Sequence, residues 1–414
     1  MEDWKEYKLG DVCTIVGRIG FRGYTTDDLT NNPKDGAITL SPTNIVAGEL
    51  DLSKPTYIKW PKYYESPEIM LEKDDIVIVK TGSSIGRTTR IREIKHPMTL
   101  NPQFVVLKDI KVDNGFLSYI IKSPLFQASL KAITVGSAIP TLSQKNLAKI
   151  SINIPEEKTQ KRISRVLSSL DDKIEVNRKM NENLEQQAMA LFKSWFVDFE
   201  PFKNGEFVES ELGMIPKGWR VGSLSSIADY INGLAMQKYR PNEGEKGLPV
   251  LKIKELGQGS CDINSELCSP SLIGDKYIIN DGDIIFSWSG TLMVKVWCGG
   301  KCGLNQHLFV VVPKNYSKWY VYQWTKYHLD NFIRIAKDKA VTMGHIKRGE
   351  LDKAKVVIPD SDNLTRIDAL MEPIFNQIIS NELESRRLST LRDTLLPKLM
   401  SGELKVNEVE ISEK

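Results

Sequence analysis

Apolar residues recur with alternating three- and four-residue spacing along two stretches of the chain, residues 163–195 and 367–399. The first stretch carries the series Ile163, Leu167, Leu170, Ile174, Asn177, Asn181, Leu184, Ala188, Leu191 and Trp195. The second carries the series Ile367, Met371, Ile374, Ile378, Asn381, Ser385, Leu388, Arg392, Leu395 and Leu399. This spacing places one apolar seam along a helix, and such a seam is buried against another helix. We therefore predict two long helices that pair with each other as a coiled coil.

Polar residues interrupt both seams near the middle, and buried polar side chains need hydrogen-bond partners. An antiparallel pairing that places Asn177 opposite Ser385 also places Asn181 opposite Asn381. A parallel pairing would match Asn177 with Asn381, so the polar layer leaves the direction open. Chain order favours the antiparallel arrangement, because the second helix starts from the far end of the first and returns. We predict an antiparallel coiled coil whose polar layer fixes the register.

The region before each helix is predicted to be a mixed α/β globule. Short β-rich runs at residues 76–79, 104–107 and 150–154 alternate with turn-forming clusters. The pattern restarts after residue 217, where Leu100-Asn101 returns as Leu304-Asn305. We predict an α+β protein built by tandem duplication of one globule and one helix. The predicted parts are a first target-binding domain (1–155), a first helix (156–200), a linker (201–217), a second domain (218–358), a second helix (359–404) and a tail (405–414).

The loops between matched strands share little, for example residues 57–67 against residues 257–270. A duplicated scaffold with two loop sets suggests two similar modules that read different targets. Ordinary drift of loop sequences is the alternative.

The composition is that of a soluble globular protein. The chain has 414 residues, a formal net charge of only +3 and no apolar run of membrane-spanning length. Five cysteines and the lack of a signal-like start indicate a cytoplasmic protein. The cysteines at 261, 268, 298 and 302 lack the closely spaced pairs of zinc sites, so we expect buried thiols and no metal site.

The best catalytic match in the chain is Asn101-Pro102-Gln103-Phe104, which is close to the Asn-Pro-Pro-Phe loop of amino-methyltransferases. No glycine-rich cofactor turn precedes it, and its duplicate reads Asn305-Gln306-His307-Leu308. We therefore predict that the shared asparagine is a turn residue. The loop 81–87 lacks the Gly-Lys-Ser/Thr ending of a nucleotide-binding loop. We expect no catalytic residue in this chain.

Basic residues cluster at matching places in the two halves, with hydroxyl and amide side chains between them. Residues 114–155 contain no acidic residue at all. Such patches suit phosphate binding together with the reading of base edges, although an ordinary solvated surface is the alternative. In the first half we predict DNA contacts from Thr81, Ser83, Ser84, Arg87, Arg90, Arg92, Lys131, Ser137, Thr141 and Lys145. In the second half we predict them from Ser287, Trp288, Ser289, Thr291, Lys337, Lys339, His345, Lys347 and Arg348.

Several motifs resemble the specificity subunit of type I restriction-modification systems, and the resemblance spans nearly the whole chain. They are Gln160-Lys161-Arg162-Ile163, Leu170-Asp171-Asp172-Lys173-Ile174-Glu175, Leu191-Phe192-Lys193-Ser194-Trp195-Phe196 and the run from Leu395 to Leu404. The second copy departs from the pattern, with Leu364 where the glutamine of the first copy stands.

The resemblance implies two target-recognition domains held apart by the coiled coil, each reading one half of a bipartite double-stranded DNA site. It implies partnership with two modification subunits, which carry S-adenosylmethionine and methylate adenine, and with restriction subunits that use ATP and Mg. This chain would bind no cofactor and would serve defence against foreign DNA. Two alternatives stay open: a coiled-coil adaptor that joins two protein-binding globules, and a self-contained DNA methyltransferase.

Overall fold

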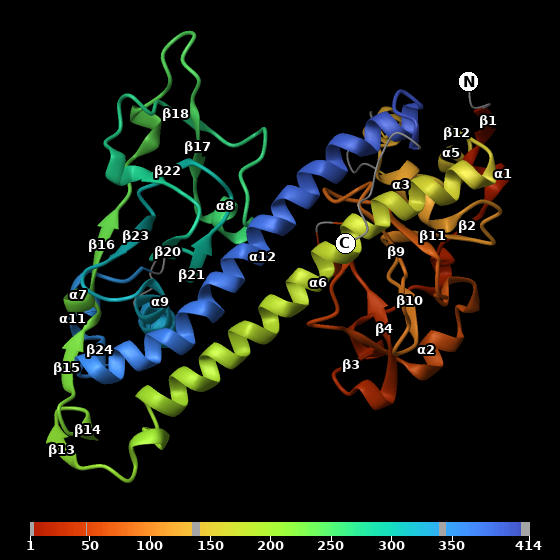
Figure 1. Ribbon diagram of the computed structural model, residues 1–414. Coiled ribbons are helices and arrows are strands. Elements are labelled where there is room, and N and C mark those ends of the chain that lie inside the picture. The colour runs from red at the N-terminus through yellow and green to blue at the C-terminus, as the bar shows by residue number, and fades with distance from the viewer. Residues whose placement is uncertain (1–3, 47, 135–140, 339–344, 407–414) are drawn as a thin grey trace. The chain divides into compact units, whose positions relative to one another are not determined.

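The computed structural model describes residues 4–46, 48–134, 141–338 and 345–406 (Figure 1). The chain forms two compact units, and each unit combines one globule with segments of both long helices. Unit 1 contains the chain up to Asp172 and again from Ser389 onward, while unit 2 contains Lys173–Leu388. The predicted α+β fold class is confirmed. The predicted domain limits stay predictions, because the two compact units divide both helices.

Unit 1 contains two four-stranded sheets. The first is antiparallel, with the order β2 (Thr14–Val16), β11 (Phe104–Lys108), β8 (Ile76–Val79) and β9 (Thr88–Arg90). The second has the order β10 (Met98–Leu100), β4 (Gly36–Leu40), β7 (Tyr57–Lys59) and β3 (Leu29–Thr30), with β10 and β4 parallel. Two small pairs are β1 (Lys5–Lys8) with β12 (Ser151–Ile154), and β5 (Ile45–Val46) with β6 (Glu49–Leu50). The short helices are α1 (Leu9–Val12), α2 (Trp60–Tyr64), α3 (Asn114–Lys122), α4 (Pro124–Ala132) and α5 (Gln144–Ala148).

Unit 2 repeats the order of the antiparallel sheet and the parallel strand pair of the second sheet. Its antiparallel sheet has the order β16 (Ala228–Asn232), β23 (Leu308–Pro313), β20 (Asp283–Ser287) and β21 (Met293–Trp297). Its second sheet has the order β18 (Leu267–Cys268), β17 (Leu248–Leu251), β22 (Cys302–Leu304) and β19 (Ile278–Ile279), with β17 and β22 parallel. A further pair joins β15 (Arg220–Ser223) to β24 (Lys355–Ile358). The short helices are α7 (Leu224–Ile227), α8 (Ile253–Gln258), α9 (Lys318–Tyr327), α10 (Leu329–Asp338) and α11 (Gly349–Lys353).

The central strands are buried on both faces, which explains why the sequence shows them as unbroken apolar runs. In β11, Val105 and Leu107 pack into one core of unit 1, and Phe104 and Val106 pack into another. Strand β23 is arranged in the same way in unit 2, where its alternate residues also enter two cores. The duplication predicted from sequence is therefore present in the antiparallel sheet, in the parallel strand pair and in the core packing. The outermost strand of the second sheet differs, because β3 pairs with β7 in unit 1, whereas β19 pairs with β22, the counterpart of β10, in unit 2.

The two long helices are α6 (Glu157–Phe196) and α12 (Ser361–Ser401) (Figure 1). In unit 1, Ile163 and Leu167 of α6 share a core with Leu396 and Leu399 of α12. In unit 2, the end of α6 at Phe192 and Phe196 shares a core with Ile367 and Met371 near the start of α12. The start of each helix therefore packs with the end of the other, and the antiparallel pairing is confirmed.

The polar layer lies in unit 2 and has the predicted register. The amide of Asn177 donates to Ser385 Oγ at 3.3 Å and to Glu384 Oε2 at 2.7 Å. Asn381 Nδ2 donates to Asn181 Oδ1 at 2.8 Å. The three asparagines are almost fully buried, so a one-turn slip would remove the partners of their amide groups. The layer therefore specifies one alignment of the helices.

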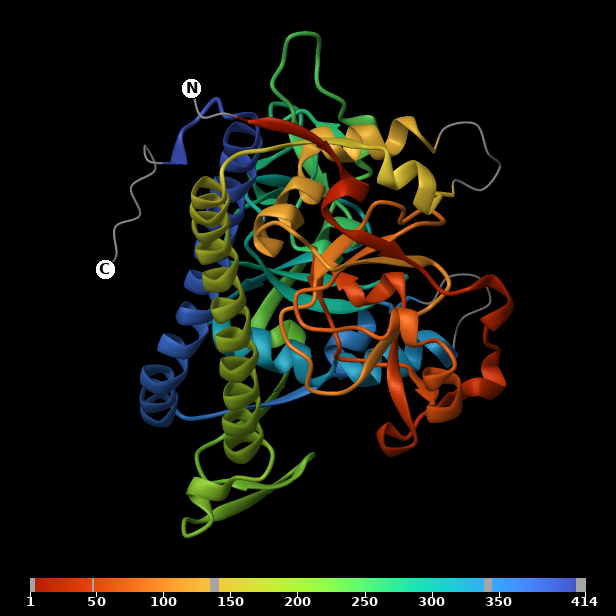
Figure 2. The same cartoon turned by 90° about the vertical axis from the view of Figure 1, so that its right-hand side faces the viewer.

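Two local features complete the description. Gly115 lies where α3 approaches α6, and a Cβ atom there would lie 2.0 Å from Ser164 Oγ, so a larger residue would require the Ser164 side chain to move. The stretch predicted as a linker contains a hairpin of β13 (Phe207–Ser210) and β14 (Gly213–Pro216), which follows the C-terminal end of α6 in Figure 2.

Candidate nucleic-acid interface

In each unit, the loop at the end of a central strand is joined by main-chain bonds to a segment about 60 residues further along the chain. In unit 1, Thr81 after β8 forms a β-bridge with Thr141, and Leu142 N donates to Lys80 O at 2.8 Å. In unit 2, Ser289 after β20 forms a β-bridge with His345, and Ile346 N donates to Trp288 O at 3.1 Å. We call residues 80–87, 103 and 141–145 bridge site 1, and residues 287–291, 307 and 345–348 bridge site 2. The structure thus brings together predicted residues that are about 60 positions apart in sequence.

Each bridge site is completed by a turn that begins at the shared asparagine. Asn101 Oδ1 accepts from Gln103 N at 2.9 Å, and Asn305 Oδ1 accepts from His307 N at 3.3 Å. In unit 1, Lys80 N also donates to Gln103 O at 2.7 Å, which fixes the turn beside the loop. The prediction that this asparagine is a turn residue is confirmed. Gln103 and His307 were absent from the predicted contacts, although the Asn-x-x repetition in both halves could have revealed them.

The predicted residues of bridge site 1 are largely accessible to solvent. Ser83, Arg87, Thr141 and Lys145 are exposed, whereas Thr81 and Ser84 are half-buried. Lys131 is exposed in the last turn of α4, and Gln127 of that helix donates to Gly86 O at 3.1 Å. Within the described parts of the chain, Arg87, Lys131 and Lys145 form no ion pair. Their charges are therefore available to an external anion. Ser137 lies outside the described residues.

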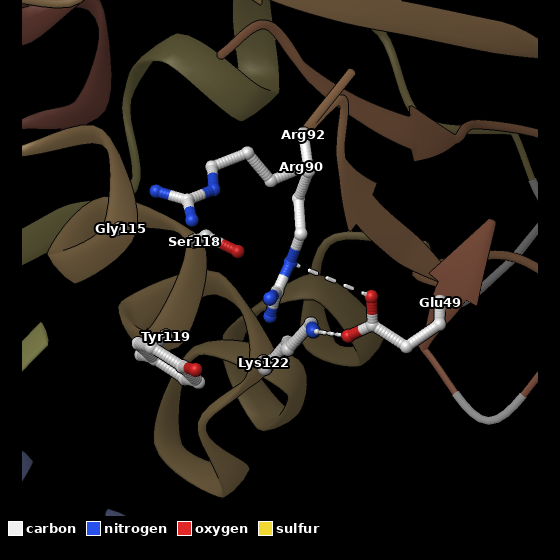
Figure 3. A pocket seen from close by; sticks show the side chains of 7 residues that line it. All are labelled: Glu49, Arg90, Arg92, Gly115, Ser118, Tyr119 and Lys122. Carbon is white, nitrogen blue, oxygen red and sulfur yellow. Dashed lines mark hydrogen bonds and ion pairs between the residues drawn. The ribbon is translucent and has the colours of Figure 1, made fainter. Parts of the chain in front are cut away.

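Arg90 and Arg92 are different, because both lie near carboxylates of unit 1. Figure 3 shows Arg92 beside Glu49. Arg92 Nε lies 3.7 Å from Glu49 Oε2, and its guanidinium also pairs with Asp171 and Asp172. Burial lowers the pKa of Arg92, but these carboxylates outweigh burial and raise the pKa above its usual value. Arg90 Nη1 lies 3.9 Å from Asp74 Oδ1. Their clustering in sequence with other basic residues therefore does not produce a free positive surface.

Bridge site 2 contains an aromatic and imidazole cluster. Trp288 Nε1 donates to Asn232 Oδ1 at 2.9 Å, and the indole stacks on Phe309 with ring centroids 5.7 Å apart. The ring of His345 meets Trp288 edge-on at 6.2 Å. Ser289 Oγ lies 3.0 Å from His307 Nδ1. The tryptophan is half-buried and His345 is exposed, so the cluster is a fixed surface rather than a core.

The remaining predicted residues of the second half fall into two groups. Thr291, Lys337 and Lys347 are exposed, Lys337 at the end of α10. Ser287 is fully buried and donates to Ser289 O at 3.2 Å, while Arg348 donates to Tyr230 O of β16 at 2.6 Å. These last two residues support the backbone of bridge site 2. Lys339 lies outside the described residues.

The thiols and carboxylates provide no metal site within the described residues. Cys268 and Cys302 are buried as predicted, whereas Cys261 and Cys298 are half-buried. Burial raises the pKa of Cys298 to about 12. Over the described stretches of the chain, no helix combines the length and apolar character needed to cross a membrane.

Comparison with known proteins gives a consistent result over the whole chain. The family model described as "Type I restriction modification DNA specificity domain" matches residues 1–186 and 216–389. The type I restriction enzyme MjaIX specificity subunit of Methanocaldococcus jannaschii is 34% identical over 425 residues, which cover 99% of this chain and 95% of the relative. The HindI specificity subunit of Haemophilus influenzae is 23% identical over 483 residues, covering 98% and 100%. The crystal structure of an S subunit from M. genitalium superposes with a TM-score of 0.53 at 15% identity, covers 96% of each chain and supports the fold.

Proposed function

This chain belongs to the specificity subunits of type I restriction-modification systems, which recognise DNA and are themselves non-catalytic, and from this membership we propose how its parts divide that recognition. Each unit reads one half of a bipartite double-stranded DNA site through its bridge site. The chain directs two modification subunits, which supply S-adenosylmethionine and methylate adenine. Restriction subunits that use ATP and Mg join the same complex.

The observation that carries the proposal is the recurrence of the bridge site. Both units hold two loops together by the same main-chain bonds, at matched positions after β8 and β20. Unpaired cations flank the hydroxyl and amide groups of bridge site 1. Phosphate contacts position a protein on DNA, and base-edge contacts specify sequence, so both kinds of group are needed at one surface.

The contacts divide by chemistry. Arg87, Lys131 and Lys145 of unit 1 and Lys337 and Lys347 of unit 2 hold phosphates, because they are exposed cations. Base edges are read by Thr81, Ser83, Ser84 and Thr141 in unit 1, and by Trp288, Thr291 and His345 in unit 2. Ser289 is buried and positions His307 instead. Arg90 and Arg92 are left out of the DNA surface, because their charges already have carboxylate partners.

The paired helices set the unread spacer between the half-sites. Helices of 40 and 41 residues are about 60 Å long at 1.5 Å per residue, compared with about 34 Å for one turn of DNA. Apolar side chains outside the seam, such as Val176 and Met180, are 50% and 41% exposed and offer a docking surface to the modification subunits.

Methylation mapping at single-base resolution tests the proposal in cells that express this chain with a cognate modification subunit. We expect methylated adenines only within a split motif of fixed spacer, and their loss when this chain is omitted. Inserting four residues into each helix, at facing positions, should lengthen the spacer and leave both half-sites unchanged. Methylation that is independent of this chain, with an active partner, would contradict the proposal and favour a protein-binding adaptor. Methylation by the purified chain alone would favour a self-contained enzyme.

A further inference from the structure

The two bridge sites share their backbone but differ in side chain at three matched positions. The residue that accepts the loop hydrogen bond is Lys80 in unit 1 and Trp288 in unit 2. The residue whose main-chain N–H donates to the turn asparagine is Gln103 in unit 1 and His307 in unit 2. The residue that forms the β-bridge with the loop is Thr141 in unit 1 and His345 in unit 2. At all three positions main-chain atoms make the bonds that hold the site together. The side chains are therefore not required for the backbone arrangement and can differ between units.

At bridge site 1 two of the three positions, Gln103 and Thr141, present an amide and a hydroxyl group, and the third is the half-buried Lys80. Gln103 is exposed, and its Oε1 accepts from Asn101 Nδ2 at 3.1 Å, which orients the amide. Gly82 faces this amide, because a Cβ atom on Gly82 would lie 3.9 Å from Gln103 Nε2. Thr141 is exposed as well. An oriented glutamine amide is suited to the paired donor and acceptor of adenine in the major groove.

At bridge site 2 the same positions present an indole and two imidazoles. The indole cannot turn freely, because its N–H is bonded to Asn232 and its face stacks on Phe309. His307 is held by Ser289, and His345 stands edge-on to the indole at the exposed side. A fixed aromatic surface is suited to the methyl group of thymine, and an imidazole N–H is suited to the acceptors of guanine.

We propose that these three matched positions determine which bases each unit reads, so that unit 1 reads through Gln103 and Thr141 and unit 2 through Trp288, His307 and His345. The inference rests on the proposed function and assigns its specificity to named residues. It adds Gln103 and His307 to the proposed DNA-binding residues. It also explains why the two half-sites differ, since different side chains occupy matched positions of a similar backbone.

The test transplants the side chains of unit 1 into unit 2. The variant Trp288→Lys/His307→Gln/His345→Thr is expressed with the modification subunit, and methylated adenines are mapped. We expect one half of the split motif to change, with roughly 5- to 150-fold loss of discrimination for its original bases. The other half and the spacer should stay as they are. A matched control replaces exposed residues of unit 2 outside the bridge site, as Glu243→Gln/Asp275→Asn, and should leave the whole motif unchanged.

A second variant makes the result specific to one half. Gln103→Ala should change the half of the motif that the transplant leaves intact. If the triple variant fails to assemble with the modification subunit, Trp288→Phe/His345→Thr keeps an aromatic ring at position 288 and tests two of the three positions. A split motif that is identical in wild type and in the assembled variants would overturn this inference and leave the proposed function standing. Loss of both halves in an assembled variant would also overturn it, whereas absence of a split motif in the wild type would contradict the proposed function itself.

Discussion

Asp171 is the centre of a buried ionic cluster in unit 1, and its replacement by asparagine tests how much this cluster stabilises the unit. The residue is only 5% exposed. It accepts from the Tyr119 hydroxyl at 2.6 Å and from Arg392 Nη1 at 2.7 Å, and Arg92 Nη2 lies 3.7 Å away. Asp171→Asn keeps the shape and an acceptor for Tyr119, but it removes the charge that Arg392 faces.

The expected loss of stability depends on the partners that Arg392 keeps in the variant. Removing one partner of a fully buried pair costs about 3–5 kcal/mol. Here Arg392 is 22% exposed and also pairs with Asp393 at 2.8 Å, so part of the loss is compensated. We expect unit 1 to lose about 2–3 kcal/mol, in line with charged hydrogen bonds of about 1.5–3 kcal/mol. Asp172, the next residue, has a 61% exposed side chain, and Asp172→Asn should cost no more than about 1 kcal/mol.

Native-state hydrogen exchange separates the two units, which global unfolding of a chain with two compact units does not. For Asp171→Asn we expect amides of β11 and α3 to exchange roughly 30- to 150-fold faster, while amides of β23 in unit 2 stay unchanged. Equal acceleration by Asp171→Asn and Asp172→Asn would refute the assignment of the stabilisation to the buried cluster. Acceleration of β23 to the same degree would also refute it.

The same cluster gives a pH dependence with a defined sign. Burial raises the pKa of Asp171, but Arg392, Lys122 and Tyr119 outweigh burial, and the pKa lies below its usual value. A depressed folded pKa stabilises fully above the unfolded value of about 3.9, and this contribution is lost as the pH falls through the folded pKa. The stability difference between wild type and Asp171→Asn should therefore be constant near neutral pH and shrink below about pH 4. A difference that persists unchanged into acid would contradict this cause.

Three further predictions concern the backbone, the charges and the helix register. Gly233→Ala should destabilise unit 2 by about 1–3 kcal/mol in urea unfolding, because the new Cβ would lie 2.2 Å from Asn305 O; an unchanged midpoint would contradict this close approach. Lys145→Ala and Lys347→Ala should each reduce the slope of log K against log salt by about 1 in DNA binding by the assembled complex, and unaltered slopes would exclude phosphate contacts at these lysines. Asn181→Leu/Asn381→Leu should not lower the melting temperature but should loosen the helix register, seen as a broader distribution of distances between spin labels on α6 and α12; a distribution as narrow as that of the wild type would show that the polar layer does not set the register.

The long helices and the duplication could be predicted because both produce repeating patterns in the sequence itself. A three-four spacing and a repeat of whole motifs do not depend on which distant residues meet. The predicted set of buried helix residues was incomplete, because Phe192, Phe196 and Phe375 are also buried in unit 2. Their rings also contact the globule, Phe192 and Phe196 at Trp324 and Phe375 at Tyr322, and the spacing of apolar residues does not reveal such contacts.

The candidate site was less predictable, because clustering in sequence does not say whether a charge is paired. Arg87 and Arg92 belong to one basic cluster, yet Arg87 is exposed and Arg92 is held by Asp171 and Asp172, about 80 positions away. The bridge sites also depend on long-range main-chain bonds, such as that between Leu142 and Lys80. Only the fold shows which residue of each half occupies the same place.

The division of the helices between the units has a consequence for synthesis on the ribosome. The core of unit 1 contains Ile163, Val166 and Leu167, which pack with Leu396, Leu399 and Val406. All of unit 2, Lys173–Leu388, is translated between these two sets of residues. The ribosome adds about 5–20 residues per second, so the first set of apolar residues is present for on the order of 10–40 s before its packing partners are synthesised. The unit that is translated first is thus the one that finishes folding last, and a nascent chain cut short anywhere in unit 2 would keep that face uncovered and open to chaperones and proteases.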